Sequence, residues 1–235
     1  MSAKERRHTE RLQRTDLFMD AQAEIFPVGS KGGDIAARLK EEAVNLAALD
    51  VARLAGASRR EQGTVGRRSV RKELRALVLT VYDTANTVAL DRPDVKGIFS
   101  LPDTDRSDAT LIATARNYAD SLAPLVNLFI EYKLPANTIN ELRSKADSLE
   151  HYIALQTDGL STRANSNAAI EETLQRLAEL IERLDTIVRN TFRDDPITLS
   201  AWERARRLES APHPKETAAN NRETAVNPPP TPSDD

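Results

Sequence analysis

Residues 170–188 read IEETLQRLAELIERLDTIV, and their apolar residues recur at alternating steps of four and three. Such steps place one residue per turn on the same side of an α-helix, so the stretch predicts a long helix with one packed face. The same phase continues toward the N-terminus through Leu160, Ile153, Leu149, Ala146, Leu142 and Ile139. We therefore expect a helix over about 137–192, and we call its apolar face the second seam.

An earlier stretch repeats the pattern and predicts a helix over about 34–90, whose apolar face we call the first seam. Its in-phase apolar positions are Ile35, Leu39, Leu46, Leu49, Val70, Leu74, Leu77, Val81 and Val88. Between the two apolar halves, the in-phase positions are Arg53, Gly56, Arg60, Gly63 and Arg67. Glycine is a poor helix former, and the second seam also has a polar middle around Gly159. The continuous phase would allow each seam to be one unbroken helix, but we favour kinks or loops near 56–66 and 158–166.

Three shorter helices complete the expected fold. They lie over about 4–25, over 108–133 with a kink at Pro124, and around Trp202, ending by Glu209. Short links such as Leu134–Pro135 require neighbouring helices to run antiparallel. The fold prediction is an all-α antiparallel helical bundle of long helices, four to six in number, with a short C-terminal helix. We expect a single helical bundle domain over 1–209 and a disordered, proline-rich tail over 210–235.

The composition narrows the class of protein. The chain has 235 residues, a net charge of −3, 29% charged residues and no cysteine. It has no stretch of eighteen apolar residues, which predicts no transmembrane helix, and its first twenty residues do not resemble a secretory signal peptide. We therefore expect a cytoplasmic protein without disulfides or thiolate metal sites. The near-neutral charge and the scarcity of aromatic residues argue against a dedicated nucleic-acid coat.

No set of residues proposes an enzymatic reaction or a metal site. A di-metal bundle needs paired Glu-x-x-His motifs, and the chain has one such motif, Glu5 with His8, near its N-terminus. None of the three histidines lies near a glycine-rich nucleophile turn. The glycine-rich segment 29–33 lacks P-loop spacing and predicts a turn between helices, with Ser30 or Asp34 as the next N-cap. We predict no catalytic, cofactor-binding or metal-binding residue and no cofactor, and we favour a protein that is not an enzyme.

The segment 53–75 is the one strongly basic stretch. It contains Arg53, Arg59, Arg60, Arg67, Arg68, Arg71, Lys72 and Arg75 against Glu61 and Glu73, a local excess of six positive charges. One interpretation is a contact surface for an anion or a partner, made by Arg60, Arg67, Arg68, Arg71 and Arg75. The other, which we favour, is that these arginines are solvated or pair with carboxylates across the bundle. The proline run 228–232 offers a polyproline ligand or, as we prefer, a solubilising tail.

Residues near the C-terminus carry a resemblance to a known family. Residues 187–192 read IVRNTF, residues 195–206 follow the pattern D-P-x-x-L-x-x-W-E-x-A-R, and residues 26–32 follow F-P-x-G-S-K-G. Together these motifs resemble a family of bacterial all-helical proteins with no assigned function, over about 12–212. The resemblance implies an all-helical fold and no activity. From the residues themselves, we expect Trp202 to fold back on the preceding long helix with Phe192, and Asp194 or Asp195 to cap the turn.

These observations favour a non-enzymatic helical bundle that acts through protein–protein contacts or self-association, as a homodimer or with another protein. Seams longer than one bundle needs would supply the surface for self-association. The alternative is a protein that binds anions or nucleic acid through the basic segment 53–75, with nucleic acid the less favoured partner. We expect no membrane partner.

Overall fold

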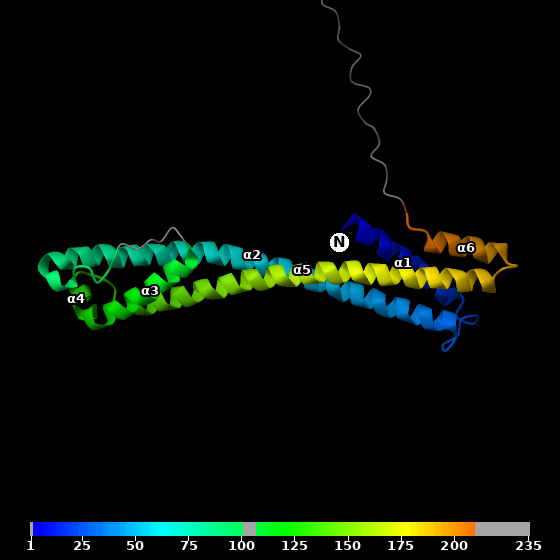
Figure 1. The fold of residues 1–235 in the computed structure, drawn as a ribbon, viewed down its shortest axis with the longest axis horizontal. Coiled ribbons are helices and arrows are strands. Elements are labelled where there is room, and N and C mark those ends of the chain that lie inside the picture. Colours follow the sequence, from blue (N-terminus) through cyan, green and yellow to red (C-terminus); the bar gives the residue numbers. More distant parts are fainter. Residues whose placement is uncertain (1, 101–106, 210–235) are drawn as a thin grey trace, which may run out of the picture. The chain divides into compact units, whose positions relative to one another are not determined.

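The computed structural model describes residues 2–100 and 107–209, and within these residues it contains helices and no β-strand (Figure 1). The α-helices are α1 (Ala3–Ala21), α2 (Lys31–Asp91), α3 (Asp108–Leu122), α4 (Val126–Glu131), α5 (Thr138–Thr191) and α6 (Pro196–Arg206). The 3₁₀ turn η1 (Pro93–Val95) follows α2, and the 3₁₀ turn η2 (Ala123–Leu125) lies between α3 and α4. The prediction of an all-α fold of long helices is confirmed, whereas the predicted disordered tail over 210–235 lies outside the described residues.

The contacts divide the described residues into two compact units. Unit 1 contains 2–36 and 184–209, and unit 2 contains 37–100 and 107–183. Both α2 and α5 contribute residues to each unit. The single domain expected over 1–209 stays a prediction.

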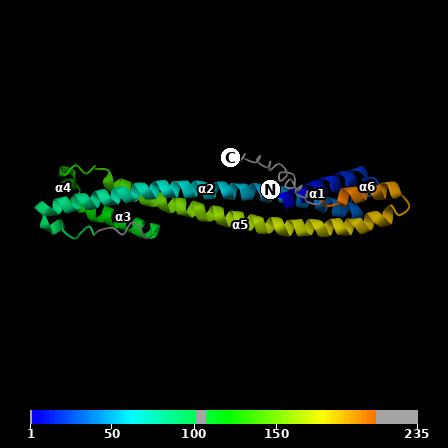
Figure 2. The same cartoon turned by 90° about the horizontal axis from the view of Figure 1, so that it is seen from above.

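The expected breaks near 56–66 and 158–166 are wrong. Helix α2 is continuous over 61 residues and α5 over 54 residues, and each runs through its polar middle without interruption. Within unit 2, the two helices lie side by side (Figures 1 and 2). The arginine–glycine middle of the first seam is therefore a helical surface that contacts another helix.

The glycines explain why α2 does not break. Gly56 and Gly63 are buried against α5, and a Cβ atom on Gly63 would lie only 2.6 Å from the backbone nitrogen of Gln156. A Cβ atom on Gly159 of α5 would lie 2.5 Å from the backbone nitrogen of Arg60. Each glycine lowers helix propensity by about 1 kcal/mol relative to alanine. At these positions, however, the missing side chain lets the two backbones approach more closely than any other residue allows, so packing offsets the loss.

The two long helices of unit 2 are antiparallel. Numbering falls along α5 as it rises along α2, as shown by three ion pairs that join them: Glu42–Arg176 at 2.9 Å, Arg59–Asp158 at 2.9 Å and Glu73–Lys145 at 2.6 Å. This confirms the antiparallel arrangement that the seams and short links predict.

Helices α3 and α4 pack against one end of this pair and complete the core of unit 2 (Figure 2). The fully buried side chains there include Leu74, Val78, Val81, Leu111, Leu122, Phe129, Leu142 and Leu149. The predicted kink at Pro124 is confirmed, because the proline lies in η2, which separates α3 from α4.

Unit 1 has its own aromatic core. Trp202 of α6 is fully buried, its ring centroid lies 5.1 Å from that of Phe18, and its Nε1 donates a hydrogen bond to Asp185 of α5 at 2.7 Å. Phe192 packs against Phe18 and Phe26 with centroid distances of 6.4 and 5.9 Å. The expected docking of Trp202 onto the last long helix is confirmed.

Two of the predicted caps are also present. Asp195 Oδ1 accepts hydrogen bonds from the backbone nitrogens of Ile197 and Thr198 at 3.1 Å, and this caps α6. Ser30 Oγ accepts one from the backbone nitrogen of Gly33 at 3.1 Å at the start of α2, so the glycine-rich segment is a turn that begins a helix. In the described part of the chain, no helix is both long enough and apolar enough to cross a membrane.

Candidate functional site

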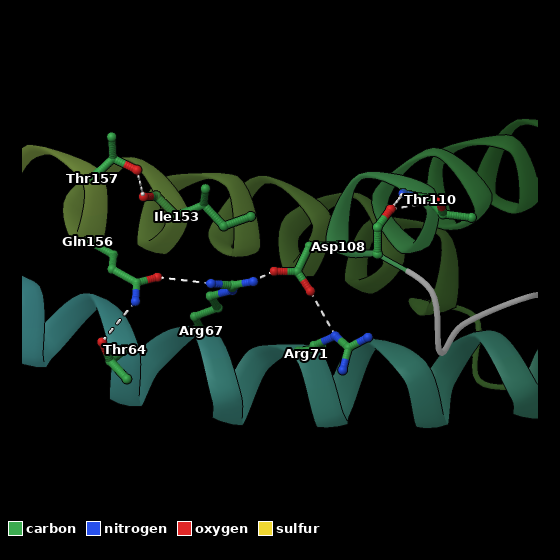
Figure 3. Close-up of polar contacts among 9 residues, drawn as sticks. Thr64, Arg67, Arg71, Asp108, Thr110, Ile153, Gln156 and Thr157 are labelled. Atoms are coloured by element: carbon green, nitrogen blue, oxygen red, sulfur yellow. Dashed lines mark hydrogen bonds and ion pairs between the residues drawn. The ribbon is translucent and has the colours of Figure 1, made fainter.

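The basic middle of α2 meets one buried carboxylate, that of Asp108 (Figure 3). Arg67 Nε lies 2.5 Å from Asp108 Oδ2, and Arg71 Nε lies 2.7 Å from Asp108 Oδ1. The Asp108 side chain is only 7% exposed, while those of Arg67 and Arg71 are 43% and 35% exposed. One carboxylate thus bridges two guanidinium groups that lie one helical turn apart.

The first turn of α3 holds this carboxylate in place. Asp108 is the first residue of α3, and Ser107 Oγ caps the helix by accepting a hydrogen bond from the backbone nitrogen of Thr110 at 3.1 Å. A negative charge in the first turn of a helix interacts favourably with the helix dipole. The ion pairs therefore attach the start of α3 to α2.

A chain of hydrogen bonds extends the cluster toward α5. Arg67 Nη1 donates to Gln156 Oε1 at 3.0 Å, and Gln156 Nε2 donates to Thr64 Oγ1 at 3.1 Å (Figure 3). The hydroxyl of Thr64 donates to the backbone oxygen of Arg60 at 2.8 Å. We call Thr64, Arg67, Arg71, Asp108 and Gln156 the arginine–aspartate cluster. It links α2, α3 and α5.

The structure brings together three of the five arginines that the sequence singled out. Arg67, Arg68 and Arg71 line one open pocket, together with Thr64, Ser107, Asp108 and Gln156. Arg60 and Arg75 do not line it. Two further arginines of the basic segment pair with carboxylates: Arg53 with Asp50, and Arg59 with Asp158. Pairing across the bundle, the interpretation that we favoured from the sequence, accounts for Arg59, Arg67 and Arg71.

Sequence reasoning missed Asp108 and Gln156. Asp108 lies 41 residues from Arg67, and Gln156 lies 89 residues from it. The serine before Asp108 signals a helix start, but no sequence pattern indicates which distant side chains that start would face. Only the register between α2 and α5 puts Gln156 opposite Arg67.

The ion pairs and hydrogen bonds of the arginine–aspartate cluster connect three helices to one another. Asp108 partly neutralises Arg67 and Arg71, and the pocket contains no cysteine, histidine or second carboxylate. Among the described residues, no group of three or more His, Asp or Glu side chains is arranged to hold a metal ion. Use of the basic segment by an external anion or nucleic acid stays a prediction.

Comparison of the chain with protein-family models, with curated proteins and with solved structures gives no match. The resemblance of its C-terminal motifs to an all-helical bacterial family therefore stays a prediction.

Proposed function

We propose that this protein is a non-enzymatic helical scaffold that associates with a second copy of itself through the outer face of α2. The single observation that carries this proposal is a row of exposed apolar side chains on α2. Val44, Val51, Leu54 and Val65 are 71%, 67%, 59% and 65% exposed. We call these four residues the outer stripe.

The spacing of the outer stripe is that of a helix-packing face. Val44 and Val51 are seven residues, or about two turns, apart, and Val65 is fourteen residues, or about four turns, beyond Val51, which puts all three near one side of α2. Leu46, two residues after Val44 and therefore about 200° around the helix, is buried, whereas Val44 lies at the edge of an open pocket beside Arg176 of α5. Helix α2 has a covered apolar face and a second, uncovered one.

The charges that flank the outer stripe favour a second copy as its occupant. Glu41 lies three residues before Val44, and Arg68 lies three residues after Val65; both are exposed. In an antiparallel pair of α2 helices, the register that opposes Val44 of one copy to Val65 of the other also opposes Glu41 to Arg68. Two-fold symmetry produces each of these contacts twice, which is the usual arrangement in homodimers.

Sedimentation velocity of the full chain tests this proposal. We expect a dimer at micromolar concentration, and we expect the double variant Val51→Glu, Leu54→Glu to sediment as a monomer with unchanged helix content. The matched control is Leu90→Glu, because Leu90 is also on α2 and 82% exposed but lies outside the stripe, so this variant should remain dimeric. A monomeric full chain at about 100 μM, or a dimeric double variant, would contradict the proposal.

Charge reversal tests the orientation. Glu41→Arg places like charges together in the antiparallel register and should weaken the dimer, and adding Arg68→Glu should restore it. Failure of the second substitution to restore association would exclude the antiparallel register.

A further inference from the structure

Six arginines gather in unit 1, on helices α1 and α6. Arg7, Arg11 and Arg14 recur at steps of four and three on α1, so they share one side of that helix. Helix α6 packs beside α1, and its end supplies Arg204, Arg206 and Arg207 (Figures 1 and 2). An open pocket between the two helices is lined by Arg11, Ser200, Glu203, Arg204, Arg206, Arg207 and Leu208.

Nearby carboxylates neutralise only part of this charge. Glu209 pairs with Arg14 at 3.1 Å, and Asp185 lies 3.2 Å from Arg206. Asp185 is shared, because it also pairs with Arg189 at 3.0 Å. Glu203, the acidic residue that lines the pocket, is likewise engaged with Arg189, at 3.1 Å. The residues that line the pocket therefore include four arginines and one carboxylate.

Several of these arginines have a buried Nε atom that donates no hydrogen bond. Among the described residues, the Nε atoms of Arg7, Arg11 and Arg14 are buried and have no hydrogen-bond partner, whereas Arg206 Nε lies 3.2 Å from Asp185 Oδ1. A buried donor left unsatisfied costs free energy, and a charged donor costs more than a neutral one. Burial, together with the neighbouring charges of Arg206 and Arg14, lowers the pKa of Arg11.

The dipole of α6 accounts for part of this positive charge. Arg204 and Arg206 lie in the last turn of α6, where the helix dipole favours positive charge. Arg11 of α1 lines the pocket beside this end of α6, whereas Arg7 lies in the first half of α1 and does not line the pocket. A negatively charged ligand from outside would offset the positive charge that the carboxylates leave in the pocket.

We infer that the pocket between α1 and α6 binds a small ligand that carries at least two linked phosphate groups. The planar guanidinium fork matches phosphate oxygens in pairs, and several arginines from two helices can contact neighbouring phosphates at once. A single phosphate would leave part of the excess charge unmatched. Ser200 adds a hydroxyl at the edge of the pocket.

Calorimetric titration of the full chain with inorganic pyrophosphate at low ionic strength tests this inference. We expect saturable binding of one pyrophosphate per chain, with a Kd below about 1 mM and tighter than that of inorganic phosphate. Arg11→Gln should weaken the binding at least tenfold. The matched control, Arg6→Gln, removes the same charge from a neighbouring, exposed position of α1 and should change the Kd less than twofold. Equal losses in the two variants, or no saturable binding, would overturn the inference.

Thermal unfolding separates binding from folding. Without ligand, Arg11→Gln should unfold at a temperature no lower than the parent, because it removes a partly buried charge beside Arg206 and Arg14. It should also lose most of the rise in unfolding temperature that pyrophosphate produces in the parent. If Arg11→Gln does not fold, Arg207→Gln gives the same test, because the exposed Arg207 side chain lines the pocket. Unchanged pyrophosphate affinity in Arg207→Gln would then overturn the inference.

Discussion

Replacing Gly63 by alanine is the sharpest test of how α2 and α5 pack. In a solvated helix this change raises stability by about 1 kcal/mol, because alanine is the better helix former. Here the new Cβ atom would lie 2.6, 2.8 and 2.9 Å from the backbone nitrogen, Cα and Cβ of Gln156. None of these atoms can rotate away, so α2 and α5 have to separate by about 0.8 Å to reach an ordinary contact of 3.4 Å.

The separation has a cost that we can estimate. Overpacking a close contact costs about 1–3 kcal/mol. Moving Gln156 away also strains its hydrogen bonds with Arg67 and Thr64, which are 3.0 and 3.1 Å long and contribute about 1 kcal/mol each. After the gain in helix propensity is subtracted, we expect Gly63→Ala to lower the free energy of unfolding by about 2 kcal/mol.

Urea denaturation followed by circular dichroism measures this loss. The matched control is Gly66→Ala, three residues further along α2. Its Cβ atom would meet the ring of Tyr152 at 2.3 Å, and a partly exposed side chain can move where a backbone cannot. Gly66→Ala should therefore cost less than Gly63→Ala. A Gly63→Ala variant as stable as the parent, or more stable, would refute the close approach of the two helices.

Two further predictions concern the polar groups of unit 2. Asp108→Asn removes the charge that bridges Arg67 and Arg71, and we expect it to lower the free energy of unfolding, measured by urea denaturation, by about 1–3 kcal/mol. The control is Asp120→Asn, whose ion pair with Arg143 is exposed, and it should lower the free energy of unfolding by less than about 0.5 kcal/mol. Equal losses in the two variants would show that the bridge stabilises the fold no more than an exposed pair does. Burial raises the pKa of Tyr118 to about 12, so the folded chain keeps a proton that the unfolded chain loses above pH 10. The free energy of unfolding should therefore fall by up to about 2 kcal/mol between pH 10 and 12, and this fall should be absent in Tyr118→Phe. The same dependence of the unfolding free energy on pH in both proteins would contradict the raised pKa of Tyr118.

The sequence predicted the parts of the fold that depend on periodicity. The seam residues Leu74, Val81, Leu142 and Leu149 are all fully buried, as their spacing indicates. Trp202 is buried as expected, because removing the surface of a large apolar side chain from water lowers the free energy of the folded state. Each of these predictions depends only on the spacing of apolar residues within one helix, so the sequence is sufficient for it.

The continuity of the helices was not predictable in the same way. Glycine is found both where a helix breaks and where two helices touch, and only the backbone of Gln156 beside Gly63 distinguishes the two cases. The arginine–aspartate cluster depends on Asp108, which approaches Arg67 only after α3 has packed on α2. Outer-stripe residues such as Val51 are visible in the sequence as a seven-residue repeat, but their exposure follows from which face of α2 meets α5.

Hydrogen exchange of the backbone amides tests the central claim most directly, because it reports on the arginine–glycine middle of α2 without any substitution. If α2 is continuous and held against α5, the amides of 56–66 are protected by hydrogen bonds whose opening requires the two helices to separate. We predict protection in 56–66 within about tenfold of that in 67–80, where the seam is apolar. Rapid, unprotected exchange over 56–66 between two protected segments would contradict a continuous helix.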